Sequence, residues 1–122
     1  MTSRRKVTVS TLSKMKLEQS KISMLTAYDA SFAAIMEASG IDSILVGDSL
    51  GNVIHGAAST LAVTVDDVIY HTRCVARAIQ YPLLIADMPF MSYHDKPTAS
   101  ITAQRLIAEG GASMVKLEGG GT

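Results

Sequence analysis

The feature that most constrains the fold is a repeating alternation of short apolar runs and longer amphipathic segments that begins at Lys21. Apolar runs of strand length occur within residues 22–25, 42–48, 81–87 and 112–120, and segments with helical spacing cover residues 29–40, 64–79 and 98–111. Continuous apolar strands that alternate with amphipathic helices are typical of a parallel sheet covered by helices. The alternation therefore predicts an α/β fold, with one further short helix expected within residues 8–20, before the repeat.

Two parallel architectures accommodate four such strands, namely a doubly wound sheet and part of a (β/α)8 barrel. A complete barrel usually needs about 250 residues, and this chain has 122. If the chain belongs to a barrel, it therefore covers about the first four β/α units, which is half of one. The segment between the second strand and the next helix, residues 49–60, contains glycine and polar residues and is expected to be a loop.

The charge and cysteine content exclude several classes of function. Eleven basic and eleven acidic residues give a formal net charge of zero, which predicts no binding to nucleic acid or to an anionic membrane surface. The single cysteine, Cys74, permits neither an internal disulfide nor a cysteine-built zinc site. No apolar run approaches the roughly 20 residues of a membrane span. We expect a soluble chain in the cytoplasm, or in an organelle matrix if residues 1–6 are the remnant of a targeting segment.

Three of the predicted strands end in an acid: Asp48, Asp87 and Glu118. The carboxyl ends of parallel strands lie at the same edge of a sheet, where active sites of both architectures are found. Carboxylates gathered there repel one another unless a cation holds them, and hard oxygen ligands favour Mg²⁺ over Zn²⁺. Lys116 precedes Glu118 by two residues on the same strand face. The competing interpretation is that these acids are helix caps or loop residues that happen to follow strands.

Five motifs resemble the ketopantoate hydroxymethyltransferase family in order and spacing. They are LTAYD (25–29), LVGDSLG (45–51), TVDDVIYHT (64–72), ADMPFMSY (86–93) and GGASMVKLEGG (110–120). The resemblance implies a (β/α)8 TIM-barrel enzyme of pantothenate biosynthesis, with residues 1–20 as an N-terminal segment and residues 21–122 as the N-terminal half of the barrel. It also implies transfer of a one-carbon unit from 5,10-methylenetetrahydrofolate to 3-methyl-2-oxobutanoate, which gives 2-dehydropantoate. The family's enzymes are homo-oligomers.

The resemblance assigns roles residue by residue. Asp48 and Asp87 match Mg²⁺ ligands, and Glu118 matches a third acid of that site, acting through a metal-bound water. Ser49 and Lys116, with the two aspartates, match contacts to the 2-oxo acid. The metal would act as a Lewis acid on an enolate of the oxo acid, with Lys116 adding positive charge. No catalytic base is expected in this chain, because the family's glutamate base and a substrate-side histidine belong to the other half of the barrel.

The three histidines do not match the family's histidine by motif. His71 lies in a predicted helix and is expected to be a packing or capping residue, whereas His55 and His94 lie on predicted loops near the acidic edge of the sheet, with open roles.

Two alternatives to the transferase function stay open. One is a phosphoenolpyruvate/pyruvate-type barrel lyase or mutase, which also acts on an oxo acid with Mg²⁺. The other is an inactive half-barrel fragment that binds metal or a partner chain. An open half-barrel has unpaired strand edges, so we expect it to associate with itself or with a chain that carries the second half.

Overall fold

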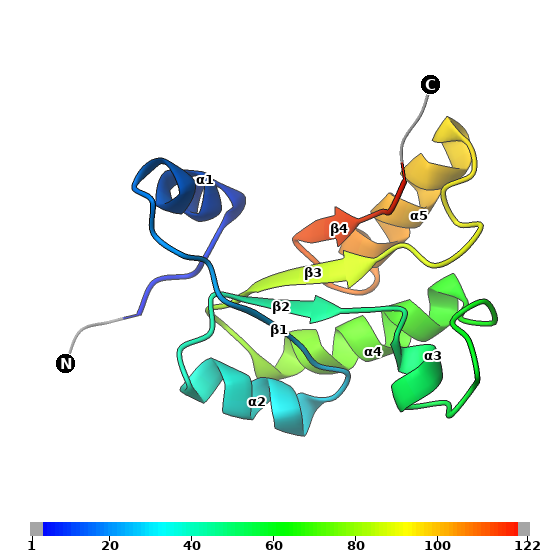
Figure 1. Ribbon diagram of the computed structural model, residues 1–122, viewed down its shortest axis with the longest axis horizontal. Helices are drawn as coiled ribbons and strands as arrows, with labels where there is room; N and C mark the ends of the chain where they lie inside the picture. Colours follow the sequence, from blue (N-terminus) through cyan, green and yellow to red (C-terminus); the bar gives the residue numbers. More distant parts are fainter. Residues whose placement is uncertain (1–3, 120–122) are drawn as a thin grey trace.

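The computed structural model describes residues 4–119 and contains one parallel sheet of four strands (Figure 1). The strands are β1 (Met24–Thr26), β2 (Ser43–Val46), β3 (Leu83–Asp87) and β4 (Met114–Lys116). Their order across the sheet is β1-β2-β3-β4, so each strand pairs with the next one along the chain. A doubly wound sheet reverses direction at a switch point, whereas a barrel advances one strand at a time. The strand order therefore favours the half-barrel.

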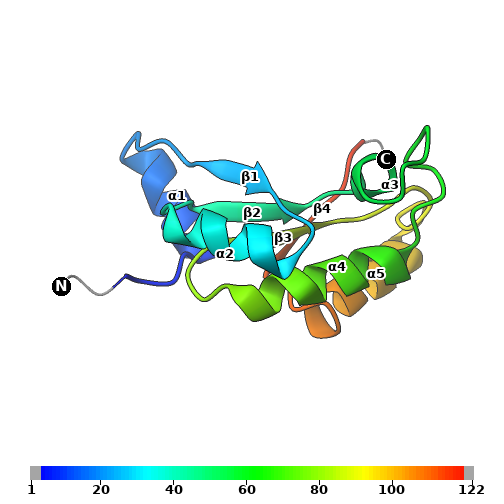
Figure 2. The ribbon, with the colours of Figure 1, turned by 90° about the horizontal axis from the view of Figure 1, so that it is seen from below.

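Five helices accompany the strands: α1 (Val9–Leu17), α2 (Ala30–Ala38), α3 (Leu50–Val53), α4 (Val65–Ala78) and α5 (Lys96–Ala108). Helices α2, α4 and α5 lie along one face of the sheet, as Figure 2 shows. Helix α1 lies beyond the end at which the strands begin, and α3 lies at the end toward which they point. The predicted loop at residues 49–60 was thus partly wrong, because its first residues form α3. Within residues 4–119, no helix has the length and apolarity needed to cross a membrane.

Side-chain caps fix where the long helices begin. The Thr64 hydroxyl accepts from the Asp67 N–H at 3.0 Å, and the Asp67 carboxylate accepts from the Thr64 N–H at 2.9 Å. This reciprocal capping box starts α4 at the predicted residue. Helix α5 begins at Lys96, two residues before the predicted start, because Asp95 caps it by accepting from the Thr98 N–H at 2.7 Å.

The core lies between the sheet and the three covering helices. Alternate residues of β2 and β3 point into it, and apolar side chains of α4 and α5 meet them; among these are Ile44, Val46, Leu84, Ala86, Val68, Val75 and Leu106. On the opposite face, Leu45 and Ile85 are only partly buried, whereas Ser43 and Leu83 are buried. In a closed barrel that face lines the interior. Asp87 and Lys116 belong to it, one residue beyond Ala86 and Val115 in the register of β3 and β4.

Candidate functional site

The three acids that the sequence places after strands lie around one pocket. Asp87 is the last residue of β3, Asp48 lies two residues beyond β2, and Glu118 lies two residues beyond β4. All three line a pocket of about 120 Å³, whose wall also includes Thr60, Leu61, Met88, Phe90 and Tyr93. The expected meeting of these carboxylates at the carboxyl edge of the sheet is therefore present.

Lys116 bridges two of these acids. Its Nζ donates to Asp87 Oδ1 at 2.8 Å and to Glu118 Oε1 at 2.7 Å. The register of β3 and β4 places Lys116 directly opposite Asp87, and the two-residue spacing places it on the same side as Glu118. Partial burial lowers the pKa of Lys116, but the hydrogen bonds to Asp87 and Glu118 outweigh it and raise that pKa above its ordinary value. The hydrogen bond from Lys116 also lowers the pKa of Glu118.

Asp48 is the acid of this pocket whose charged form is disfavoured. Its backbone N–H donates to Asp87 Oδ2 at 3.0 Å, which holds the two aspartates together. Burial raises the pKa of the Asp48 carboxyl most, and repulsion by Asp87 raises it further. Hydrogen bonding by Thr60 opposes this rise, and the effects of Glu118 and Lys116 are smaller still. A nearby cation would stabilise the charged form of such a carboxylate.

The donor set fits a hard cation that needs few protein ligands. Within residues 4–119, no three Asp, Glu, His or Cys side chains converge as a group that could hold a metal ion. The Lys116 ammonium instead holds Asp87 and Glu118. Mg²⁺ commonly takes only one or two carboxylates from the protein and completes its octahedral shell with water and substrate oxygens. Asp48 and Asp87, which border the same pocket, suit that mode of binding.

Ser49 lies beside the acids and is bonded to a residue that the sequence analysis did not select. Although it occupies the N-cap position of α3, its side chain makes no capping bond. Its Oγ instead lies 2.6 Å from the Tyr28 hydroxyl. A Cβ on Gly47 would lie 3.1 Å from Ser49 Oγ and 3.6 Å from Asp87 Oδ2, so the small size of Gly47 leaves room for both groups. The signal for Tyr28 in the sequence was its place two residues after the first strand, within LTAYD.

The three histidines follow the sequence-based prediction only in part: His71 does, whereas His55 and His94 do not line the acidic pocket. His71 is a packed residue, as predicted, and its Nδ1 lies 2.7 Å from the Tyr28 carbonyl oxygen. His55 follows α3 and is exposed. His94 is exposed too, with Nδ1 2.8 Å from the Met91 carbonyl oxygen and Nε2 3.3 Å from the Asp95 carboxylate. Neither of these two lies among the residues that line the acidic pocket.

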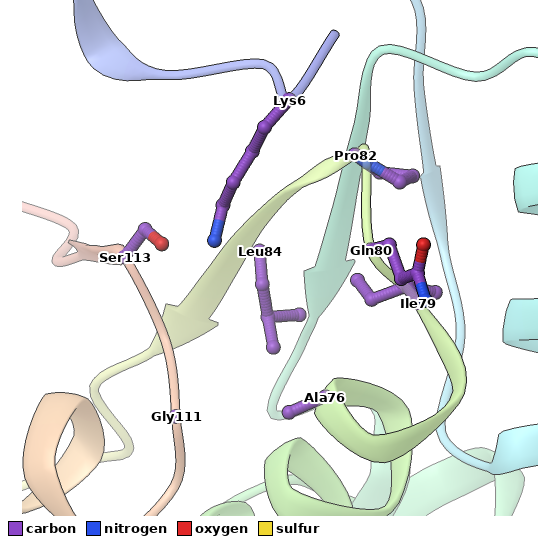
Figure 3. Close-up of a pocket in the computed structure, with 8 residues that line it drawn as sticks. All are labelled: Lys6, Ala76, Ile79, Gln80, Pro82, Leu84, Gly111 and Ser113. Atoms are coloured by element: carbon purple, nitrogen blue, oxygen red, sulfur yellow. The ribbon is translucent and has the colours of Figure 1, made fainter. Parts of the chain in front are cut away.

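A second, smaller pocket lies at the opposite end of the sheet. Its volume is about 60 Å³, and its wall includes Lys6, Ala76, Leu84 and Ser113. Figure 3 shows the Lys6 side chain extending toward Leu84 and Ser113. No acid, histidine or cysteine belongs to the lining that the structure describes. In barrels the end at which strands begin serves stability, and the opposite end carries the chemistry. The acidic pocket is therefore the candidate site.

Comparisons with known proteins show which family the chain is similar to. The family model described as ketopantoate hydroxymethyltransferase matches residues 6–122. A protein of Nitrosococcus oceani named 3-methyl-2-oxobutanoate hydroxymethyltransferase is 57% identical over 115 residues, which are 94% of this chain and 44% of that protein. The protein of that name from Aromatoleum aromaticum is 52% identical over 93% of this chain and 42% of its own length. The chain thus spans less than half the length of these curated relatives.

Solved structures with little sequence similarity share the fold. A phosphoenolpyruvate phosphomutase from Streptomyces platensis superimposes with a TM-score of 0.72 at 17% identity, over 90% of this chain and 37% of that one. An oxaloacetate acetylhydrolase gives a TM-score of 0.67 at 18% identity, over 93% and 40%. At such identities the likeness concerns the fold alone. It confirms an α/β fold that corresponds to about half of a (β/α)8 barrel.

Proposed function

Because the chain belongs to the ketopantoate hydroxymethyltransferase family, we propose that it supplies the half that carries the acidic pocket of an enzyme that makes 2-dehydropantoate. The reaction would transfer a hydroxymethyl group from 5,10-methylenetetrahydrofolate to 3-methyl-2-oxobutanoate. The observation that carries this proposal is the meeting of Asp48, Asp87, Glu118 and Lys116 at the carboxyl edge of the sheet. We also propose a cytoplasmic location, since both substrates are water-soluble metabolites.

Asp48 and Asp87 would hold Mg²⁺ through their carboxylates, and Glu118 would hold it through a water molecule. The support is chemical: two carboxylates share one pocket, and burial together with repulsion by Asp87 raises the pKa of Asp48. When bound, the ion would act as a Lewis acid toward the oxygens of the oxo acid.

The remaining side chains would bind and orient the oxo acid. The pKa of the Lys116 ammonium is raised, so the group stays protonated. It would stabilise the negative charge that develops on the keto oxygen of the oxo acid. Ser49 offers a hydroxyl that no helix cap consumes. The apolar side chains of Leu61, Met88 and Phe90 line the same pocket and suit the branched alkyl group of the substrate. The family resemblance assigns proton abstraction to a glutamate outside residues 1–122, so these residues bind and orient the substrate.

The test is a turnover assay on a chimera in which residues 1–122 replace the matching half of the Nitrosococcus oceani relative. Product should form only when Mg²⁺ and methylenetetrahydrofolate are both present. Asp48→Ala and Asp87→Ala should each lower turnover by at least about 100-fold, because even the loss of a group that only orients a metal ligand costs about 10- to 100-fold. Asp66→Ala, at an exposed carboxylate on α4, is the matched control and should retain activity. Turnover without folate, or full Mg²⁺-dependent activity of Asp48→Ala, contradicts the proposal.

The lyase or mutase alternative rests on a likeness at 16–18% identity, which extends to the fold and no further. The folate requirement in the same assay separates it from the transferase.

The proposed partners include polypeptide as well as small molecules. Residues 21–122 would form the N-terminal half of the barrel and residues 1–20 a separate N-terminal segment. Within the described residues, β1 and β4 each pair with one strand only, so both edges of the sheet are open. We therefore propose that the chain forms homo-oligomers or associates with a chain that carries the second half of the barrel.

A further inference from the structure

We infer that Tyr28 is a positioning residue for the oxo acid, which it serves by directing the Ser49 hydroxyl. This inference rests on the proposed function, because it concerns the same site. The observation behind it is the hydrogen bond of 2.6 Å between the Tyr28 hydroxyl and Ser49 Oγ. It joins the loop after β1 to the loop after β2 next to the acidic pocket.

The Tyr28 side chain is held in place from two directions. The His71 ring, on α4, donates from Nδ1 to the Tyr28 carbonyl oxygen at 2.7 Å, because a carbonyl oxygen can only accept. The next residue, Asp29, is fixed as the N-cap of α2 by the Phe32 N–H at 2.8 Å. The ring itself packs against the hydrophobic core. The Tyr28 hydroxyl is therefore presented to Ser49 by an ordered backbone and a packed ring.

The direction of this hydrogen bond decides what Ser49 can do. Each hydroxyl has a single hydrogen to donate. A phenol is more acidic than an aliphatic alcohol, so Tyr28 is the better donor of the pair. When Tyr28 donates, the Ser49 oxygen is occupied as an acceptor and its own hydrogen stays available. Ser49 then presents a donor and selects an oxygen acceptor, such as the carboxylate or keto oxygen of a 2-oxo acid.

The position of Ser49 makes this control useful. Gly47 leaves space that Ser49 Oγ and Asp87 Oδ2 both border. Without Tyr28, the Ser49 hydroxyl would be free to turn toward Asp87, whose carboxylate borders the same space beside Gly47. A Ser49 hydroxyl that turned toward a carboxylate would be lost to the substrate and would compete for a proposed metal ligand. Tyr28 thus favours the rotamer and hydrogen direction in which Ser49 faces an incoming anion.

The experiment is a double-mutant cycle on the chimera described above, with calorimetric titration of 3-methyl-2-oxobutanoate in the presence of Mg²⁺. Tyr28→Phe should weaken oxo acid binding about three- to tenfold, the range of one hydrogen bond. Ser49→Ala should weaken it at least as much, and the double variant should match Ser49→Ala, because Tyr28 acts through Ser49. Tyr70→Phe removes an exposed phenol on α4 and should bind like the wild type.

The affinity for Mg²⁺ alone separates a positioning role of Tyr28 from a structural one. The affinity of Tyr28→Phe for Mg²⁺ should stay within about twofold of the wild type, because its metal ligands are untouched; damage to the fold would weaken both. Wild-type oxo acid binding by Tyr28→Phe, or additive losses in the double variant, overturns the inference and leaves the proposed function standing. A chimera that binds Mg²⁺ but no 2-oxo acid overturns the proposed function and the inference together.

Discussion

Lys116 supplies the internal counter-charge of the acidic pocket. The Asp87 side chain is only 7% exposed, and Lys116 donates to it while remaining 37% exposed itself. An ammonium in this position offsets part of the negative charge of Asp87 and Glu118 in the absence of a metal. It therefore competes with any cation that Asp87 binds, and metal binding would free Lys116 to contact an anionic substrate.

This competition predicts opposite effects of Lys116→Met on the two ligands. The variant should bind Mg²⁺ more tightly than the wild type, because no ammonium competes for Asp87, and it should bind 3-methyl-2-oxobutanoate more weakly. Without metal, the uncompensated buried carboxylate should lower the free energy of unfolding by about 1–3 kcal/mol. Calorimetric titration and urea unfolding measure both effects. Lys14→Met, on the surface of α1, is the control. Weaker Mg²⁺ binding by Lys116→Met would show that the lysine assists the metal.

At Asp48 we expect the stability of the fold and the binding of metal to favour different residues. Burial and the neighbouring Asp87 raise its pKa, so the folded chain binds more protons at this residue than the unfolded chain does. Stability therefore falls as the pH rises through that pKa, and at neutral pH the charged Asp48 is destabilising. Asp48→Asn should raise the thermal midpoint at pH 7 slightly, by less than about 1 kcal/mol in free energy because the group is partly solvated.

The same variant should lose most of its affinity for Mg²⁺. The stabilisation should shrink as the pH is lowered, since Asp48 of the wild type then becomes protonated. Thermal unfolding from pH 4 to 8 and Mg²⁺ titration test these expectations. A destabilised Asp48→Asn, or one that keeps its Mg²⁺ affinity, would mean that Asp48 has another role. Asp67→Asn is the control with the opposite expected sign. Hydrogen bonding by Thr64 lowers the pKa of Asp67, so this variant should be less stable than the wild type at pH 7.

At the scale of single elements, two helices have the same cap but different tertiary roles. Thr8 with Thr11 and Thr64 with Asp67 form reciprocal capping boxes at α1 and α4. Helix α1 has no buried residue, whereas α4 buries Val68, Ile69, Thr72 and Val75 against the sheet. A helix that is integral to the core must unfold with the whole molecule, but a peripheral helix can fray alone.

Thr64→Ala should therefore lower the global free energy of unfolding by about 1 kcal/mol, the usual cost of a lost cap. Thr8→Ala should change it little, although hydrogen exchange of the α1 amides should become faster. Urea unfolding followed by circular dichroism, with hydrogen exchange on both variants, distinguishes the two cases. Equal global losses would show that α1 unfolds cooperatively with the sheet.

The sequence predicted the elements whose signals are local. Strands β2 and β3 are continuous apolar runs, and α4 carries its capping box in its own residues. The four-residue helix α3 was missed because it has no side-chain cap. It contains the fully buried Leu50, and a Cβ on Gly51 would lie 2.6 Å from Val63 Cγ2. The first strand was placed too early at Ile22, because pairing with β2 begins only at Met24.

The candidate site shows the same division. That Asp48, Asp87 and Glu118 meet follows from strands that run in parallel, so the pattern alone predicted it. That Lys116 lies between Asp87 and Glu118 depends on the register of β3 and β4, which no local pattern encodes. The bond from Tyr28 to Ser49 joins two loops that are 21 residues apart, and only their tertiary positions bring them together.

For the whole molecule, the described sheet has two open edges, which favour association in solution. Beside β1, large apolar side chains are exposed on the strand and on α2, among them Met24, Leu25, Phe32 and Ile35. An apolar groove of about 300 Å³ lies next to them and is lined by Phe32, Met36, Val53 and Ile54, among others. The interior of a closed barrel and its outer helices would cover such surfaces. Contiguous apolar surface beside an unpaired strand favours association.

We therefore predict that the chain, at micromolar concentration, sediments as a species heavier than its 12.9 kDa monomer. The double variant Phe32→Asp, Ile35→Asp should shift the distribution toward monomer, because each exposed apolar side chain contributes about 1.5–3 kcal/mol when it is buried at an interface. Leu17→Asp is the matched control, since Leu17 is 85% exposed on α1, at the other end of the sheet.

The remaining half of a curated relative, added as a separate polypeptide, should replace the self-associated species by a one-to-one complex. In the proposed barrel it would supply the strands that pair with β1 and β4, and it would thus satisfy backbone groups and cover apolar surface together. Sedimentation velocity with both polypeptides measures the exchange. A stable, monodisperse monomer that ignores the added half would mean that the two open edges are protected by the chain itself, and the proposed association would then be wrong.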